Sequence, residues 1–95
     1  MYLHIGEETV VRTDEVLGIF DIENTTVSPA TRDFLAAAEQ HGHVVTIGDD
    51  LPRSFVVCMA DDGTQTVYIS QISCATLRKR AKRIAQSGNM ASLFL

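Results

Sequence analysis

The most continuously apolar run in the sequence is Phe55-Val56-Val57-Cys58-Met59-Ala60. A run of this length between polar turn residues is typical of a strand that is buried on both faces. The following Asp61-Asp62-Gly63-Thr64 predicts a turn, and Thr66 to Ile69 predicts a strand that returns as the antiparallel partner of the run. The core is therefore expected to centre on residues 55–60.

Shorter apolar runs precede the central one. Residues 1–5, 9–11 and 16–20 each predict a short strand, and residues 43–47 predict another. Gly18 lies inside the third of these runs, which predicts a β-bulge or a close approach of another backbone segment. The N-terminal part of the chain is therefore expected to be a compact β unit.

A first helix is expected to begin at Ser28-Pro29, a capping residue followed by a proline at the first helical position. Gly42 is expected to end this helix. The alanines at positions 36–38 allow another backbone to come close, either inside the molecule or on a neighbouring subunit.

A second helix is expected from Cys74 to Ser87, with Ser73 as its cap and Gly88-Asn89 as its stop. Its apolar residues repeat at i, i+4, i+7 and i+8, which predicts one buried stripe, and basic residues cover the remainder. These residues are Arg78, Lys79, Arg80, Lys82 and Arg83. The helix is therefore expected to be amphipathic with a cationic outer face.

Length and composition bound the fold to one domain. A chain of 95 residues can bury one core but not two. With four phenylalanines, two tyrosines and no tryptophan, the core is expected to be aliphatic. We predict an α+β protein with a small, mainly antiparallel sheet and two helices. The domain is expected to span residues 1–88, and the apolar tail 89–95 is either frayed or docked in a groove of this or another subunit.

The sequence lacks the motifs that several classes of function require. No apolar run approaches the ~18–20 residues that span a bilayer, so we expect a soluble, cytoplasmic protein without membrane contact. No G-x-S-x-G, phosphate-cradling glycine loop or H-E-x-x-H motif occurs, so we expect neither an enzyme nor a cofactor or small-molecule substrate. The pair His41 and His43 and the paired aspartates are interpreted as surface groups, and no metal site is predicted.

Charge is segregated along the chain. Residues 1–62 carry all twelve acidic residues and three basic ones, a net charge of −9, whereas residues 63–95 carry five basic residues and no acid. A helix that only keeps a protein soluble usually mixes both signs. The predicted helix at 74–87 is therefore expected to meet something anionic.

Duplex DNA fits this helix better than other polyanions. Single-strand binding usually needs aromatic side chains, and the helix has none. A helix that binds a membrane surface usually has bulky Trp, Phe or Leu side chains on its apolar face, whereas the stripe here is Leu77, Ala81, Ile84 and Ala85. One monomer would neutralise at most five phosphates, so useful affinity would require several copies side by side. A homo-oligomer is therefore part of the DNA-binding hypothesis.

Two other functions stay open. The basic helix could dock an acidic protein, including the acidic region of a neighbouring copy, without binding DNA. Cys74 lies at a predicted helix start near cations, which is the setting of reactive thiols, so a redox sensor is a third possibility. Both cysteines are otherwise expected to be reduced.

The chain also resembles the RemA/RemB family of regulators of extracellular matrix (biofilm) genes in Gram-positive bacteria, and within it the RemB branch. The resemblance covers residues 1 to about 83. The matching stretches are Met1-Tyr2-Leu3-His4-Ile5-Gly6, Val16-Leu17-Gly18-Ile19-Phe20-Asp21, Thr26-Val27-Ser28-Pro29, Arg32-Asp33-Phe34-Leu35, Pro52-Arg53-Ser54-Phe55-Val56-Val57, Tyr68-Ile69-Ser70 and Thr76-Leu77-Arg78-Lys79-Arg80.

The resemblance implies a small cytoplasmic β/α protein and, from the RemA branch, a transcriptional activator whose subunits assemble into a ring that presents basic residues to DNA. In that branch the loop before the central strand is arginine-rich, and here it retains only Arg53. Another arginine of that branch, just ahead of the third strand, is replaced by Glu15. We therefore expect the basic helix to supply most phosphate contacts, assisted by Arg53.

Overall fold

The computed structural model describes residues 1–22 and 28–87. The stop predicted at Gly88-Asn89 and the tail 89–95 lie outside the described residues. In chain order the elements are β1 (Tyr2–Gly6), β2 (Thr9–Arg12), the 3-10 turn η1 (Thr13–Glu15), β3 (Val16–Asp21), α2 (Pro29–Gln40), β4 (Val44–Thr46), β5 (Ser54–Met59), β6 (Gln65–Ser70) and α3 (Cys74–Ser87). The predicted α+β class is confirmed, and the strands at 1–5, 9–11, 16–20 and 43–47 are each found within about two residues.

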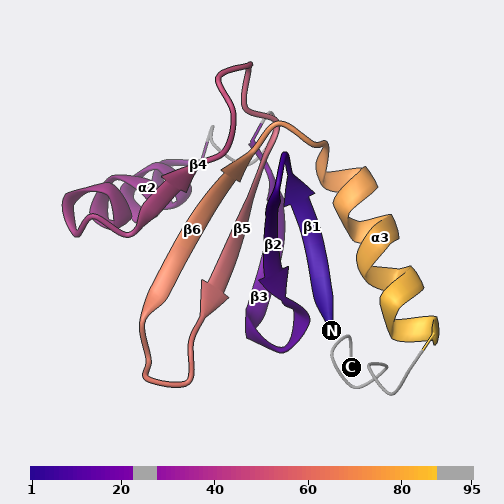
Figure 1. Cartoon of the computed structure of the whole chain (residues 1–95). Helices are drawn as coiled ribbons and strands as arrows, with labels where there is room; N and C mark the ends of the chain where they lie inside the picture. The colour runs from indigo at the N-terminus through magenta and orange to yellow at the C-terminus, as the bar shows by residue number, and fades with distance from the viewer. Residues whose placement is uncertain (23–27, 88–95) are drawn as a thin grey trace.

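A four-stranded sheet with the order β3-β5-β6-β4 forms the centre of the molecule (Figure 1). β5 is the central strand that the apolar run predicts, and its residues Ser54 to Cys58 are all buried. It pairs antiparallel with β3 and with β6, whereas β4 pairs parallel with β6. The register between β3 and β5 shifts between Val16 and Gly18, which confirms the predicted bulge.

β1 and β2 form a separate antiparallel hairpin. The hairpin is attached to the sheet by Ser70 at the end of β6, whose hydroxyl donates to the Ile5 carbonyl at 2.6 Å. The same hydroxyl accepts the backbone N–H of Ile72 at 3.0 Å, and Ser54 donates to the Ile72 carbonyl at 2.6 Å. Ser54 and Ser70 are completely buried, so their hydrogen bonds replace those that water would otherwise supply.

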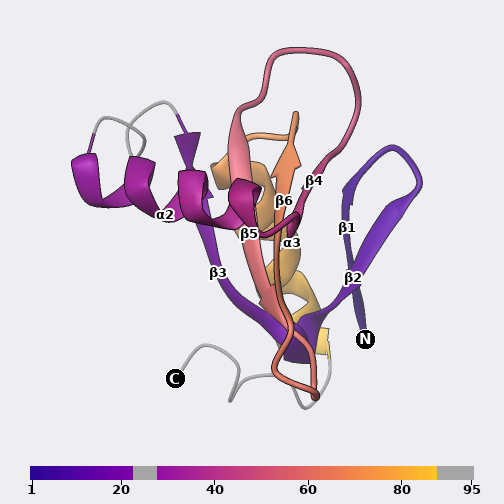
Figure 2. The ribbon, with the colours of Figure 1, turned by 90° about the vertical axis from the view of Figure 1, so that its left-hand side faces the viewer.

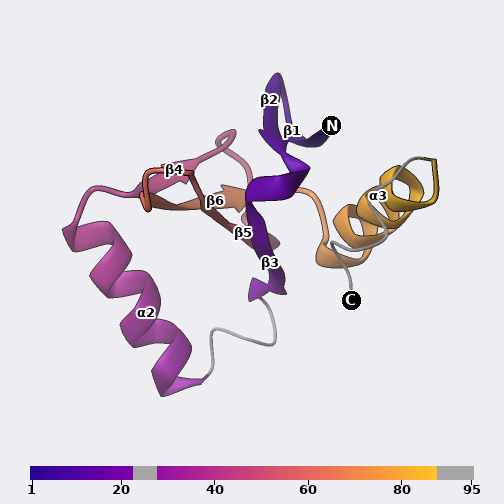
Figure 3. The same ribbon diagram turned by 90° about the horizontal axis from the view of Figure 1, so that it is seen from below.

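The sheet separates two hydrophobic clusters. On one face the hairpin and α3 pack against residues such as Val56 and Cys58. On the other face Phe55, Val57 and Val67 form a smaller cluster under α2. Figures 2 and 3 show α2 and α3 on opposite sides of the sheet, with α2 crossing the strands.

The two helices are capped differently. Ser73 accepts the backbone N–H of Thr76 at 3.2 Å, which confirms the predicted cap of α3. Ser28 occupies the capping position of α2, but its side chain makes no capping hydrogen bond, so that part of the prediction is wrong. At the other end of α2, Nδ1 of His41 donates to the Ala37 carbonyl at 2.7 Å, just before Gly42 with φ +72°.

One residue of the alanine stretch of α2 packs inside the molecule. Ala38 is half-buried and packs against the cluster around Phe55, whereas Ala36 and Ala37 are exposed. None of the helices in residues 1–22 and 28–87 is long and apolar enough to cross a bilayer.

Candidate nucleic-acid interface

α3 is anchored to the molecule along its apolar stripe. Cys74, Leu77 and Ala81 are buried in the same cluster as Leu3 and Ile19, and Leu77 has an exposed fraction of 0 %. Burial of this stripe fixes how α3 is rotated about its own axis. Because successive residues of an α-helix are ~100° apart around that axis, the rotation sets the direction in which each basic residue leaves the helix.

Arg78 and Arg80 flank the buried stripe and reach back to the scaffold. Nη2 of Arg78 donates to the Ile19 carbonyl of β3 at 3.1 Å. Nη1 of Arg80 donates to the His4 carbonyl of β1 at 3.1 Å and lies 3.5 Å from Nδ1 of the same histidine. His4 in turn contacts the Glu7 carbonyl through Nε2. The two arginines therefore attach α3 to two different strands.

Lys79, Lys82 and Arg83 lie on the part of α3 that is exposed to solvent, and Lys82 also lines a pocket between α3, β1 and β3. All three side chains are exposed. Within residues 1–22 and 28–87 none of them forms a hydrogen bond or an ion pair. The predicted cationic face therefore consists of three exposed groups without a partner among the described residues and two arginines that also hold the helix in place.

Ion pairs of the described residues lie elsewhere. Arg12 donates to Asp14 at 2.8 Å and lies 3.8 Å from Glu15. The hydrogen bond and the charge of Asp14 raise the pKa of the Arg12 guanidinium above its usual value. The five basic residues of α3 make no such pair with a carboxylate in the described ranges. Their charge is therefore not neutralised by the fold.

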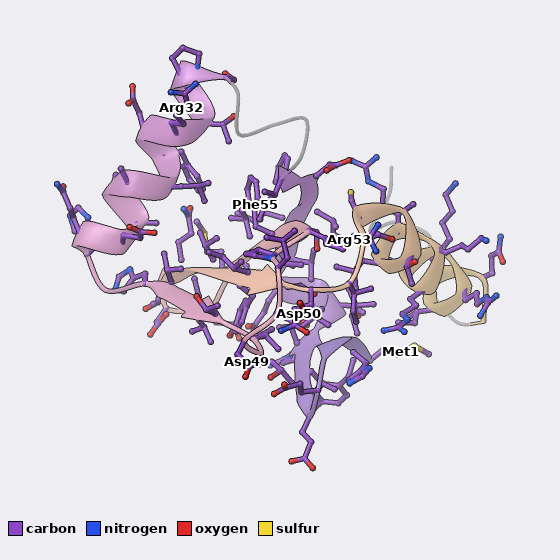
Figure 4. All side chains as sticks on the ribbon, turned by 90° about the horizontal axis from the view of Figure 1, so that it is seen from above. Met1, Arg32, Asp49, Asp50, Arg53 and Phe55 are labelled. Carbon is purple, nitrogen blue, oxygen red and sulfur yellow. The ribbon has the colours of Figure 1, made fainter. Side chains whose placement is uncertain are left out.

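Arg53 lies outside α3, directly before β5. Its backbone N–H donates to the Ser70 carbonyl at 2.9 Å, and its carbonyl accepts the N–H of Ile22 at 3.2 Å. The side chain is exposed and unpaired within the described chain. In Figure 4 Arg53 lies between the sheet and α3, whereas Arg32 lies on α2 at the far side. The structure thus places Arg53 on the α3 side of the molecule.

The loop that leads to Arg53 is held by Gln71. With its amide oxygen turned toward the loop, Gln71 accepts the backbone N–H groups of Asp49 at 2.8 Å and Asp50 at 2.7 Å. Gly48 has φ +75°, and a Cβ there would lie 1.9 Å from the Gln71 amide, so glycine is needed at this contact. The loop is therefore held at its start by Gln71 and at its end by the backbone hydrogen bonds of Arg53, which together fix the position of Arg53.

Cys74 does not have the setting of a reactive thiol. It is 6 % exposed, and its Sγ lies 3.6 Å from the Ile19 carbonyl. Reactive thiols are usually accessible to solvent. Cys58 is also buried, which raises the pKa of its thiol to about 11. These observations favour a structural role for both cysteines over the redox-sensor interpretation.

The attachment of Arg78 and Arg80 to backbone carbonyls was not predicted. The sequence pattern places both residues at the margins of the apolar stripe, which is the position from which long side chains reach a neighbouring element. It does not indicate which carbonyls they meet, because those belong to β1 and β3 at the other end of the chain.

Comparisons with known proteins agree with the resemblance noted in the sequence. A family model described as RemA-like, "Extracellular matrix regulatory protein A-like", matches residues 2–81. The chain is 38 % identical over 82 residues to "Extracellular matrix regulatory protein B" of Bacillus subtilis (strain 168), an alignment that covers 86 % of this chain and 91 % of that protein. The chain therefore belongs to the RemA/RemB family of extracellular matrix regulatory proteins, in its RemB branch.

Proposed function

We propose that the protein regulates extracellular matrix gene expression as a homo-oligomer that contacts the phosphates of duplex DNA. Membership of the RemA/RemB family supports the regulatory part of the proposal. The proposed contacts are Arg53, Arg78, Lys79, Arg80, Lys82 and Arg83.

The observation that carries the DNA-binding part is the unpaired charge of α3. Lys79, Lys82 and Arg83 are exposed and have no partner among the described residues, and no acidic residue follows Asp62 in the chain. The basic residues attract phosphate groups that approach this face, and no carboxylate on α3 competes for them. Each phosphate contact releases counterions that were condensed on the DNA. This charge pattern is expected of a surface that binds a polyanion.

The six residues are expected to contribute unequally. Lys79, Lys82 and Arg83 are the primary contacts, because no bond to the described protein must be broken first. Arg78 and Arg80 each keep further N–H donors while they hold a carbonyl, because a guanidinium has five. All of these contacts position the protein on DNA and read no bases, so sequence preference would come from assembly and DNA shape.

Exposed apolar groups near α2 support the homo-oligomer. α2 has no fully buried residue, and Phe34 on it is 37 % exposed. Leu17 and Phe20 of β3 are 61 % and 38 % exposed, and with Phe34 they line an open groove of about 400 Å³. A continuous apolar surface of this kind usually marks a contact with another protein surface. Several copies would multiply the modest affinity of one basic helix.

Mobility-shift titration of duplex DNA at about 50 mM and about 200 mM salt tests the proposal. Binding through the five helix cations predicts a slope of log K against log salt near −4.5 per subunit. Replacing Lys79, Lys82 and Arg83 together with Gln should reduce the slope by about 2.7. Arg32→Gln is the control for the effect of removing one positive charge, because Arg32 lies on the far side of the molecule, and it should leave the slope unchanged. Equal losses for the control and the triple variant would contradict the assignment.

A module that docks an acidic protein is the second candidate, and the separation of charge favours it. Acidic residues such as Glu7, Asp49 and Asp61 are exposed and could meet the basic helix of a neighbouring copy. In that case the molar mass in solution would fall as salt rises, with no mobility shift at any salt concentration.

A further inference from the structure

An apolar pocket lies beside the basic helix, between β3, β1 and α3. Its volume is about 420 Å³, which falls within the ~300–1,000 Å³ of small-molecule sites. Leu3, Leu17 and Ile19 supply apolar walls, and Arg78 and Lys82 of α3 supply its charged groups. The DNA-binding proposal gives this pocket no task.

Small residues leave this space open. Gly18 and Ala81 both line the pocket, one from the bulge of β3 and one from the face of α3 toward the sheet. A larger side chain at position 81 would reduce the space, because Ala81 lines the pocket. The Phe20 ring cannot fill it, because the ring stacks on Phe55 at a centroid distance of 5.0 Å. A Cβ at Gly18 would meet the Phe20 ring at 2.7 Å, so Ala81 is the small residue whose size bears on the opening.

The pocket lining specifies the chemistry of a ligand. Thr13 contributes a hydroxyl, but it is 2 % exposed and donates to the Met1 carbonyl at 3.2 Å. No buried side-chain nitrogen or oxygen in residues 1–22 and 28–87 lacks a hydrogen-bond partner. A ligand body inside the pocket would therefore find few polar groups to bind and should be apolar. No acidic residue lines the pocket, so the charged part of the ligand should be anionic.

We propose that this pocket binds a small amphipathic carboxylate, such as a medium-chain fatty acid. The hydrocarbon chain lies against Leu3, Leu17 and Ile19, and the carboxylate pairs with Lys82 and Arg78. Lys82 has no partner within the described chain, and Arg78 keeps free N–H donors beside its bond to the Ile19 carbonyl. The ligand is bound as an effector and is not chemically changed.

This site would regulate DNA binding, an extension that rests on the proposed function. The carboxylate would neutralise two of the cations assigned to phosphate contact. Because each lost phosphate contact reduces the salt slope by about 0.9, a saturating ligand should weaken DNA binding and lower the slope by about 0.9 to 1.8 per subunit.

Titration calorimetry of the full chain with decanoate, below its aggregation concentration and without DNA, tests the site directly. Saturable binding with one ligand per subunit is expected, and each methylene from octanoate to decanoate should tighten binding about fourfold. Decanol should bind at least about tenfold more weakly, and decyltrimethylammonium should not bind, because each lacks the anionic head. Equal binding of all three amphiphiles would overturn the proposal.

Two variants locate the bound ligand. Lys82→Gln should weaken decanoate binding about tenfold, whereas Lys79→Gln should not, because Lys79 carries the same charge on the same helix outside the pocket. Ala81→Val should reduce binding by filling the space, with folding checked by circular dichroism. Equal effects of the two lysine variants would overturn the assignment. Binding of the protein to phosphatidylglycerol vesicles without any binding of free decanoate would also overturn it.

Failure of this proposal and failure of DNA binding are distinguishable. Decanoate binding without any DNA mobility shift would support the pocket and remove only its regulatory role. A normal DNA shift without decanoate binding would remove the pocket proposal and leave the proposed function intact.

Discussion

α2 and α3 have 12 and 14 residues and lie on opposite sides of one sheet, but only α3 is part of the core. α3 buries Cys74, Leu77 and Ala81 and is held by two arginines, whereas α2 has no fully buried residue. Because α3 is anchored in the core, its basic residues are held in one arrangement relative to the sheet. A helix that is only half packed leaves apolar surface for another contact. The two helices therefore differ in what they offer to a partner.

The largest expected difference between the helices is in stability. Leu77→Ala should lower the free energy of unfolding by about 2–5 kcal/mol, because the side chain is 0 % exposed and its removal leaves a cavity. Leu35→Ala in α2 should cost about 1 kcal/mol, because Leu35 is half-buried. Chemical denaturation measures both values, and equal losses would remove the distinction between the helices.

The arginine attachments should contribute less than the core. Arg80→Ala should lower the free energy of unfolding by about 1–1.5 kcal/mol, because it removes the hydrogen bond to the His4 carbonyl. Arg83→Ala is the matched control on the same helix and should change stability by less than about 0.5 kcal/mol. If both substitutions leave stability unchanged, the attachment of α3 to β1 is not a source of its rigidity.

The two caps sharpen the comparison further. Ser73→Ala should destabilise the protein by about 1 kcal/mol, because the side chain accepts the N–H of Thr76. Ser28→Ala should have almost no effect, because the Ser28 side chain makes no capping bond. Thermal unfolding of the two variants in one buffer gives the result, and a larger loss for Ser28→Ala would reverse the interpretation.

The effect expected to be smallest near pH 9 concerns a thiol in the core beneath α3. Burial raises the pKa of the Cys58 thiol from 9.0 to about 11. Above pH 9 the unfolded chain therefore loses this proton while the folded chain keeps it, so stability falls as pH rises from 9 toward 11. The loss should be about 0.4 kcal/mol at pH 9. Cys58→Ala should remove this part of the pH dependence in denaturation curves, and an unchanged curve would contradict it.

The sequence was most informative where one local signal was strong. The run 55–60 predicted the central strand, Gly18 predicted the bulge, and Ser73 predicted the start of α3. Each of these signals depends on residues that are adjacent or one turn apart. The parallel pairing of β4 with β6 had no such signal, because the two strands are separated in the chain by β5 and the loops on either side of it.

The candidate interface was predictable in composition but not in arrangement. Spacing alone indicated which residues of α3 are basic and which face is apolar. Two arginines of α3 are attached to the strands, and its other three basic residues are exposed without a partner in the described part of the chain. This arrangement depends on the carbonyl of Ile19, 59 residues before Arg78, and the carbonyl of His4, 76 residues before Arg80. The pocket beside α3 was also missed, because its lining comes from β1, η1, β3 and α3, and α3 lies far along the chain from the other three.

The buried hydroxyl of Ser70 bonds to Ile5, 65 residues earlier in the chain. During synthesis the N-terminal hairpin therefore leaves the ribosome long before the residues that secure it, and about 70 residues at ~5–20 per second correspond to several seconds. The contact between Ser70 and Ile5 joins residues that are far apart in the sequence, and such contacts form slowly. We therefore expect docking of the hairpin to be a slow step of folding. Until then Leu3 and Ile5, which are buried in the finished molecule, remain open to water and to chaperones.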